Sequence, residues 1–161
     1  GCLAAMPDST AIFAPHMNSY ERFVDGAHAP TGAAWGYDNR TVSIRIPAGP
    51  PVARRIEHRV AGGDLNPYLG IAAMLGAALN GIEDEAEPPA PVEGNAYEIE
   101  GLPTLAPTMA AALDRFEASP LMARIFPAQL IDCLVRMKRQ EIERFEALSP
   151  KEHWLSYLET V

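Results

Sequence analysis

The sequence has no run of roughly 20 apolar residues, so we expect no helix that spans a membrane. It also lacks the basic segment and short apolar core of a secretory signal. These absences favour a cytoplasmic protein with no membrane partner. The first residue is Gly1 rather than Met, and we expect this start to be the cut edge of a longer chain.

Cysteine is scarce. Cys2 and Cys133 are the two cysteines, and neither has a Cys or His neighbour at the spacing of a metal site. We therefore expect two free thiols, as in proteins of a reducing compartment.

Positive charge is also scarce, with 13 Lys and Arg against 21 Asp and Glu and a net charge of −8. The net acidity lies in residues 83–161, because charges balance in residues 1–82. Nucleic-acid partners require a broad basic surface, so we expect none. At 161 residues and 48% hydrophobic composition, the chain is long and apolar enough to form the core of one domain.

Against this background, one segment is strongly basic. Residues 39–60, NRTVSIRIPAGPPVARRIEHRV, contain a single carboxylate, Glu57, and five arginines. The arginines are Arg40, Arg45, Arg54, Arg55 and Arg59. Crowded like charges cost free energy unless an anion lies among them, so this segment is the first candidate for a binding site.

The pattern of apolar residues predicts an α+β fold, with short antiparallel strands followed by packed helices. Alternation indicates strands at 41–46 and 55–60, which a short Pro- and Gly-rich turn joins as an antiparallel pair. Asn66 and Pro67 predict the start of a buried helix that ends near Gly81. After an acidic, Pro-rich surface segment at 83–104, we expect helices from 104 or 107 to 118, from 127 to 148, and from 150 through Leu158.

Strand alternation places Arg55, Glu57 and Arg59 on one face, which Arg45 can share from the neighbouring strand. His58 falls on the opposite, apolar face, where we expect it to pack in the core. Guanidinium groups bind phosphate and carboxylate oxygens in pairs, and a glutamate is a hard ligand for Mg²⁺ or Mn²⁺. This set of groups suits ATP-dependent phosphoryl transfer. From spacing alone, a self-compensating Arg–Glu–Arg ladder on a solvated face is an equally good interpretation.

The motifs of this chain resemble, in order and spacing, the C-terminal part of the catalytic domain of the glutamine synthetase family. They are NSYERF at Asn18–Phe23, AP at Ala29–Pro30, NRTVSIRIP, RRIEHR, and NPYL at Asn66–Leu69. The likeness continues through Gly94–Tyr97, Leu102–Pro103 and Glu141–Phe145, and so covers essentially the whole chain. The stretches WGYDNR and EHRVAGGDLNPYL are similar to the branch that ligates glutamate to polyamines such as putrescine.

The resemblance implies a ligase in which ATP phosphorylates the γ-carboxylate of glutamate, and ammonia or an amine attacks the acyl phosphate. It implies ATP with Mg²⁺ or Mn²⁺ as cofactors and a homo-oligomeric ring. Residues 1–161 would be the C-terminal portion of the catalytic domain, without the N-terminal β-grasp domain and the first part of the catalytic domain. We therefore expect the isolated chain to be inactive and to bind no cofactor tightly.

The resemblance also implies residue roles. Glu57 matches a metal-binding glutamate, and Arg59 and Arg22 match arginines that hold glutamate or its developing phosphate. Arg40 matches an arginine near both ATP and the acyl phosphate. Two more arginines match positions on the nucleotide side, Arg45 and Arg55.

One position departs from the ammonia-using members. His28 stands before Ala-Pro, at a flap position that usually carries Glu, and an imidazole binds ammonium less well than a carboxylate. This favours a larger amine, unless His28 is a surface residue with no role. Tyr97 lies near a regulatory tyrosine of some bacterial members, but GNAYEIEG differs from that pattern and we assign it no modification. A non-catalytic structural member of the superfamily and a plain anion-binding module are the alternative functions.

Overall fold

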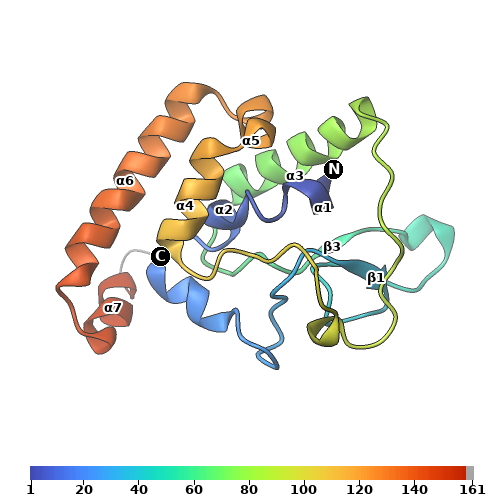
Figure 1. Cartoon of the computed structure of the whole chain (residues 1–161), viewed down its shortest axis with the longest axis horizontal. Coiled ribbons are helices and arrows are strands. Elements are labelled where there is room, and N and C mark those ends of the chain that lie inside the picture. The colour runs from blue at the N-terminus through green and yellow to red at the C-terminus, as the bar shows by residue number, and fades with distance from the viewer. Residues whose placement is uncertain (159–161) are drawn as a thin grey trace.

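The structure of the chain, a computed structural model, describes residues 1–158 (Figure 1). Residues 159–161, which the domain prediction included, lie outside the described residues. In chain order the elements are α1 (Cys2–Ala5), α2 (Thr10–Phe13), η1 (Met17–Arg22), β1 (Trp35–Tyr37), β2 (Ile44–Ile46), η2 (Pro51–Ala53), β3 (Glu57–His58), α3 (Pro67–Glu83), η3 (Ala96–Glu98), α4 (Met109–Ala118), α5 (Pro120–Ile125), α6 (Ala128–Glu146) and α7 (Pro150–Tyr157). The longer helices occupy one side of the molecule and the small sheet the other (Figure 1).

The sheet has the order β1-β2-β3. Strands β2 and β3 are antiparallel, as predicted, but each is shorter than its alternating segment. Strand β1 pairs parallel to β2 and was not predicted, because three residues that include a glycine carry no alternation signal. Gly36 is required there: a Cβ at this position would lie 2.6 Å from the carbonyl oxygen of Val92, whose segment packs across the strand.

Helix α3 begins as predicted, since Asn66 Oδ1 accepts hydrogen bonds from the backbone N–H groups of Tyr68 and Leu69 at 3.0 and 3.2 Å. The helix continues past Gly81 to Glu83. Its inner face is buried, but the prediction of burial all round is wrong for the outer face. Five large hydrophobic residues are exposed there: Tyr68, Ile71, Leu75, Leu79 and Ile82.

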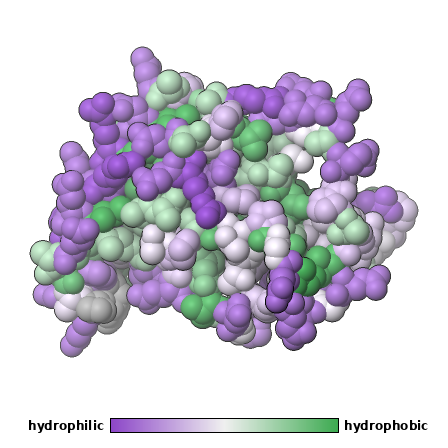
Figure 2. All heavy atoms as spheres, in the orientation of Figure 1, coloured by the Kyte–Doolittle hydropathy of each residue, from purple (hydrophilic) through white to green (hydrophobic). Residues whose placement is uncertain are grey.

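Helices α4, α5 and α6 follow in the second half of the chain, and capping side chains mark the starts of the first two. Thr108 accepts from the N–H of Ala111 at the start of α4, close to the predicted position. Ser119 ends α4, but it also caps α5, a short helix that was not predicted. Helix α6 agrees with the predicted 127–148 segment within two residues at each end. Figure 2 shows hydrophilic side chains along the outer edge of α6.

The main core lies where the helices meet the sheet. Phe13, Leu113, Phe116 and Met122 are among its fully buried side chains. His58 packs against Phe13 with ring centroids 4.1 Å apart, and burial lowers the pKa of His58 to about 4. The expectation of a packed core histidine is confirmed.

This arrangement confirms the predicted α+β class, and both cysteines are free thiols as expected. Within residues 1–158, no helix combines the length and apolar character needed to cross a membrane.

Candidate functional site

The basic segment folds so that charged side chains pair across β2 and β3. The strand register sets Arg45 opposite Glu57, and Arg45 Nη1 donates to Glu57 Oε2 at 2.9 Å. Arg59 Nε lies 3.2 Å from the other oxygen, Glu57 Oε1. Arg45 Nη2 donates to Asp38 Oδ1 at 2.9 Å. We call Asp38, Arg45, Glu57 and Arg59 the charge ladder.

The charge ladder is neutral, with two shielded arginines and two partly exposed carboxylates, Asp38 at 49% and Glu57 at 40%. It holds two guanidinium groups and two carboxylates, and the side chains of Arg45 and Arg59 are only 18% and 15% exposed. An Arg–Glu–Arg ladder is therefore formed on a partly exposed face, with Arg45 in place of Arg55. Because the ladder compensates itself, the excess positive charge of the segment resides on three exposed arginines, Arg40, Arg54 and Arg55.

Asp38 is a member of the ladder that the sequence analysis did not identify. It lies one residue outside the basic segment, in a left-handed backbone conformation with φ of 46°. Hydrogen bonds from the backbone N–H of Ala48 and from Arg45 lower the pKa of Asp38. Asp and Asn are common in the left-handed conformation that this turn requires. Nothing in the sequence indicates that Asp38 pairs with Arg45.

Arg59, the predicted glutamate-binding arginine, is held from several sides. Besides Glu57, its guanidinium contacts the backbone carbonyls of Arg40 and Val42, and its Nη2 is 3.5 Å from the carbonyl of His28. The structure therefore brings together the three predicted catalytic positions. The side chain of Arg59 contacts the backbone carbonyls of Arg40 and His28.

Arg22, the second predicted substrate-binding arginine, lies at the end of η1. Its Nη2 donates to the backbone carbonyls of Phe13, at 3.2 Å, and of Val60. Burial lowers the pKa of Arg22, while nearby Asp64 and Tyr20 act in the opposite direction. These contacts join η1 to the end of β3, and a role of Arg22 in binding glutamate stays a prediction.

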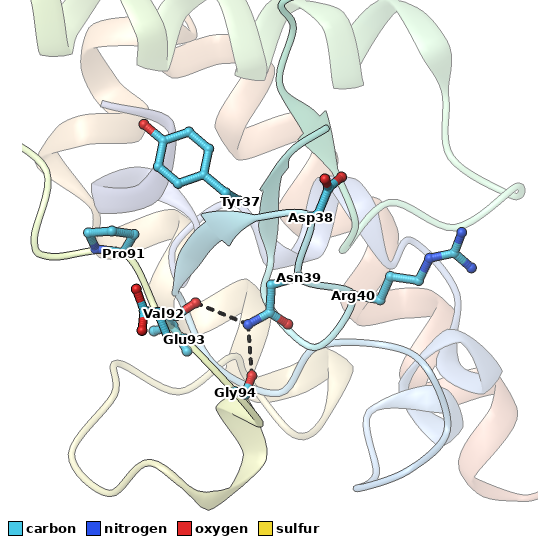
Figure 3. Close-up of a pocket in the computed structure, with 8 residues that line it drawn as sticks. All are labelled: Tyr37, Asp38, Asn39, Arg40, Pro91, Val92, Glu93 and Gly94. Carbon is cyan, nitrogen blue, oxygen red and sulfur yellow. Dashed lines mark hydrogen bonds between the residues drawn. The ribbon is translucent and has the colours of Figure 1, made fainter. Parts of the chain in front are cut away.

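Arg40 borders a hollow of about 510 Å³ between the turn after β1 and residues 91–94 (Figure 3). Asn39 joins the two walls, because its Nδ2 donates to the carbonyls of Val92 at 3.1 Å and Gly94 at 2.8 Å. Figure 3 shows Tyr37 and Arg40 extending in opposite directions from this turn. The exposed guanidinium of Arg40 is thus accessible to an anion from solvent.

Arg55 does not join the charge ladder as alternation predicted. Strand β3 covers only Glu57 and His58, so Arg55 precedes it, and Arg55 Nη1 donates to the carbonyl of Ala53 at 3.1 Å. A second hollow, of about 460 Å³, lies beside Arg55. It is lined by Trp35, Tyr37, Ile46, Arg54, Arg55 and Ile56.

The residues described here do not make a complete metal site. Among residues 1–158, no group of three or more His, Cys, Asp or Glu is close enough to hold an ion. Glu57 is one carboxylate, and each of its oxygens already faces a guanidinium group. A hard divalent ion needs about six oxygen ligands, so Glu57 alone would not hold such an ion.

The fold and the site belong to a known class. The family model described as "glutamine synthetase, catalytic domain" matches residues 1–157, so the chain belongs to this family. The resemblance seen in the sequence motifs is confirmed.

Two curated relatives and one solved structure are similar to this chain. Gamma-glutamylethanolamide synthetase GlnA4 of Streptomyces coelicolor is 40% identical over 149 residues, covering 91% of this chain and 31% of that protein. Gamma-glutamylputrescine synthetase PuuA of Escherichia coli is 40% identical over 148 residues, covering 92% and 31%. A solved structure described as a GmaS/ADP complex superimposes with a TM-score of 0.77 at 28% identity, covering 93% of this chain and 36% of that chain. The names of the two relatives agree with the amine-ligating branch, and this chain spans about a third of their length.

Proposed function

We propose that this chain is the C-terminal portion of the catalytic domain of a ligase that joins the γ-carboxylate of glutamate to an amine. ATP would phosphorylate the carboxylate, and the amine would displace phosphate from the γ-glutamyl phosphate. Membership of the glutamine synthetase family and the names of the two relatives support the proposal. The observation that carries it is the fixed Arg59 guanidinium, held between Glu57 and the backbone carbonyls of His28 and Arg40.

The chain's own residues would act by electrostatic positioning. Groups that are fixed before the reaction need no reorganisation when charge develops, and Arg45 and Arg59 are fixed by the ladder. Arg40 and Arg55 are exposed at the mouths of two hollows and can approach phosphate oxygens. We assign Arg40 to the transferred phosphate, Arg45 and Arg55 to the nucleotide side, and Arg59 and Arg22 to glutamate.

The cofactors of the whole protein would be ATP and a divalent ion, Mg²⁺ or Mn²⁺. Since Glu57 alone does not complete such a site, we propose that further ligands lie elsewhere in the protein. The isolated 161-residue chain should then bind neither Mg²⁺ nor ATP measurably. Isothermal titration tests this expectation, and micromolar binding by the isolated chain would contradict it.

The exposed outer face of α3 supports the proposal that another portion of the same domain packs against this helix. Leu75, Leu79 and Ile82 are 61%, 58% and 73% exposed on this face. An apolar hollow of about 400 Å³ adjoins it, between Cys2, the sheet and the end of α3. In Figure 2 this hollow opens beside the segment that continues from α3. Large apolar surfaces of this kind mark interfaces, and the relatives are about three times longer than this chain.

The rest of the catalytic domain would cover this face. The complete protein would form a homo-oligomeric ring in the cytoplasm, in which the β-grasp domain of a neighbouring subunit completes each site. Mass photometry of the full-length protein tests the ring.

His28 bears on the choice of amine. It is exposed on the loop between η1 and β1, where a carboxylate would attract ammonium more strongly than an imidazole. We therefore propose that an organic amine reacts in preference to ammonia. Returning a carboxylate with His28→Glu should raise kcat/KM for ammonia relative to the organic amine.

The decisive experiment measures ADP release by the full-length protein with glutamate, ATP and a panel of ammonia, ethanolamine and putrescine. We expect release that depends on both glutamate and an amine, with at least one organic amine giving a higher kcat/KM than ammonia. No release with any amine would refute the ligase. Preference for ammonia would refute only the interpretation of His28.

A further inference from the structure

Residues 24–30, which we call the flap loop, combine an exposed tip with a buried stem. Residues 24–28 are exposed, whereas Ala29 is 5% exposed and Pro30 is fully buried. His28 has a φ of 62°, in the left-handed region that residues other than glycine adopt uncommonly. Such a conformation costs about 1–2 kcal/mol and persists where surrounding contacts hold it. The contacts that hold the stem therefore determine where His28 lies.

Two side chains hold neighbouring carbonyls of this stem. Tyr97 Oη donates to the carbonyl of Ala29 at 2.9 Å, and Arg59 Nη2 lies 3.5 Å from the carbonyl of His28. The same guanidinium contacts Glu57 and the backbone of Arg40. The adjacent carbonyl groups of His28 and Ala29 therefore couple the position of the flap loop to the orientation of Arg59.

Tyr97 can act as a brace because its own backbone is anchored. It lies in η3, where Asn95 Oδ1 accepts from the N–H of Tyr97 at 3.2 Å. The next anchor is the N–H of Ala96, which donates to Thr41 Oγ1 at 2.9 Å. Thr41 directly follows Arg40, so η3 connects the turn of Arg40 to the flap loop.

We propose that Tyr97 is a positioning residue that holds the flap loop over the Arg59 end of the charge ladder. The inference rests on the proposed ligase function and assigns a role that the family resemblance did not. Burial raises the pKa of Tyr97, so the hydroxyl keeps the proton that it donates.

The consequence concerns water. In the productive reaction the amine attacks the γ-carbonyl carbon, and the bond from that carbon to the phosphate oxygen breaks. If the flap loop moves away, water attacks the same carbon, and glutamate and phosphate are released without an amide. A closed site prevents this hydrolysis of a reactive intermediate. Loss of the brace should therefore uncouple ADP release from amide formation.

The test compares Tyr97→Phe with wild type in the full-length protein, using the amine that supports ADP release. The substitution removes one hydroxyl and leaves the ring. We expect the ADP released without amide, measured relative to amide, to rise about two- to tenfold, the shift produced by loss of one neutral hydrogen bond. We also expect faster hydrogen exchange of backbone amides in residues 24–30. The control is Glu100→Gln, at an exposed position three residues after Tyr97, which should change neither quantity.

The outcomes separate the inference from the proposed function. A parallel fall in ADP and amide, at constant ratio, would show that Tyr97 serves stability alone and would overturn the inference. Unchanged exchange in residues 24–30 would also overturn it. If the wild-type protein releases no ADP with any amine, the proposed function fails, and the exchange measurement alone decides whether Tyr97 holds the loop.

Discussion

Arg45 and Glu57 face each other across the antiparallel pair β2–β3, with 2.9 Å between Arg45 Nη1 and Glu57 Oε2. The other oxygen of Glu57 faces Arg59 at 3.2 Å, so a single carboxylate serves two arginines. Neither arginine side chain is more than 18% exposed. Loss of the carboxylate would leave two cations poorly solvated side by side, which makes Glu57 the most sensitive point of the ladder.

The first prediction is that Glu57→Gln destabilises the 161-residue chain by about 1–2 kcal/mol. A fully buried pair would lose about 3–5 kcal/mol, but Glu57 is 40% exposed and solvent screens part of the loss. Urea unfolding at pH 7 measures the change. Glu87→Gln is the control, because Glu87 is exposed in the acidic segment. Equal unfolding midpoints for both variants would show that the ladder does not stabilise the fold.

Glu57→Gln also separates the proposed ligase from a plain anion-binding module. In a ligase that needs the carboxylate, glutamate-dependent ADP release by the full-length protein should fall by at least about 10²-fold. In an anion-binding module, the neutral substitution leaves binding of inorganic phosphate, the probe for this test, intact or stronger. Retention of full ADP release would remove Glu57 from the proposed site.

Arg59→Lys tests whether the planar guanidinium is needed or only its charge. Lysine keeps the cation but cannot contact Glu57 and two backbone carbonyls at once. We expect kcat of the full-length protein to fall by about 10²–10³-fold, as for removal of one pre-oriented group. Arg136→Lys is the control, since Arg136 is 76% exposed on α6 and its ion pair contributes little. An unchanged kcat would contradict the role of Arg59.

The sequence was sufficient for the parts of this site that depend on local patterns. Alternation predicted the antiparallel pair and a face that Arg45 can share with Glu57, and the cap at Asn66 predicted the start of α3. Contacts between distant segments were not predictable in this way. Tyr97 meets Ala29 across 68 residues, and no local pattern indicates such a pairing. The family resemblance identified the segments but not this contact.

The outer face of α3 shows a different limit. Apolar residues all round a helix predict complete burial, and Leu75 and Leu79 are nevertheless exposed. In residues 1–158 only the inner face of α3 is covered. This exposed face is the one on which we propose that the rest of the catalytic domain docks.

His58 gives a prediction for pH. Burial lowers its pKa to about 4 from 6.5, so the unfolded chain binds more protons than the folded chain between these values. Stability should therefore fall as pH decreases through this window, by about 2 kcal/mol between pH 7.5 and pH 5. His58→Leu should remove this part of the pH dependence, whereas the exposed His28→Asn should retain it. Parallel pH profiles for His58→Leu and wild type would refute the assignment.

The carboxylate of Glu141 predicts a second loss of stability, in a more acidic pH range. Burial opposes its charge, but His16, Lys138 and Tyr157 surround the carboxylate and lower its pKa to about 2 from 4.5. The stabilisation is complete above pH 4.5 and disappears as pH falls toward 2, with a full value of about 2–3 kcal/mol. Glu141→Gln should be less stable than wild type at pH 7, and the difference should narrow through this window. Glu143→Gln, at an exposed position of the same helix, should show no such difference.

The last prediction tests the proposed docking of α3 by comparing the same substitution in two contexts. Leu79→Gln changes a side chain that is 58% exposed in this chain, so the unfolding free energy of the 161-residue chain should change by less than about 0.5 kcal/mol. The isolated variant should also self-associate less than wild type, because it presents less apolar surface. In the full-length protein the same glutamine would be buried against the rest of the catalytic domain.

Burial of an unpaired amide in that setting costs about 1–3 kcal/mol, and the lost leucine adds to it. The full-length variant should therefore denature at a clearly lower temperature than the wild type in differential scanning fluorimetry. A comparable loss in both contexts would mean that Leu79 supports the fold of this chain. A loss in neither would mean that the outer face of α3 stays in water in the complete protein, and the proposed covering of that face would be wrong.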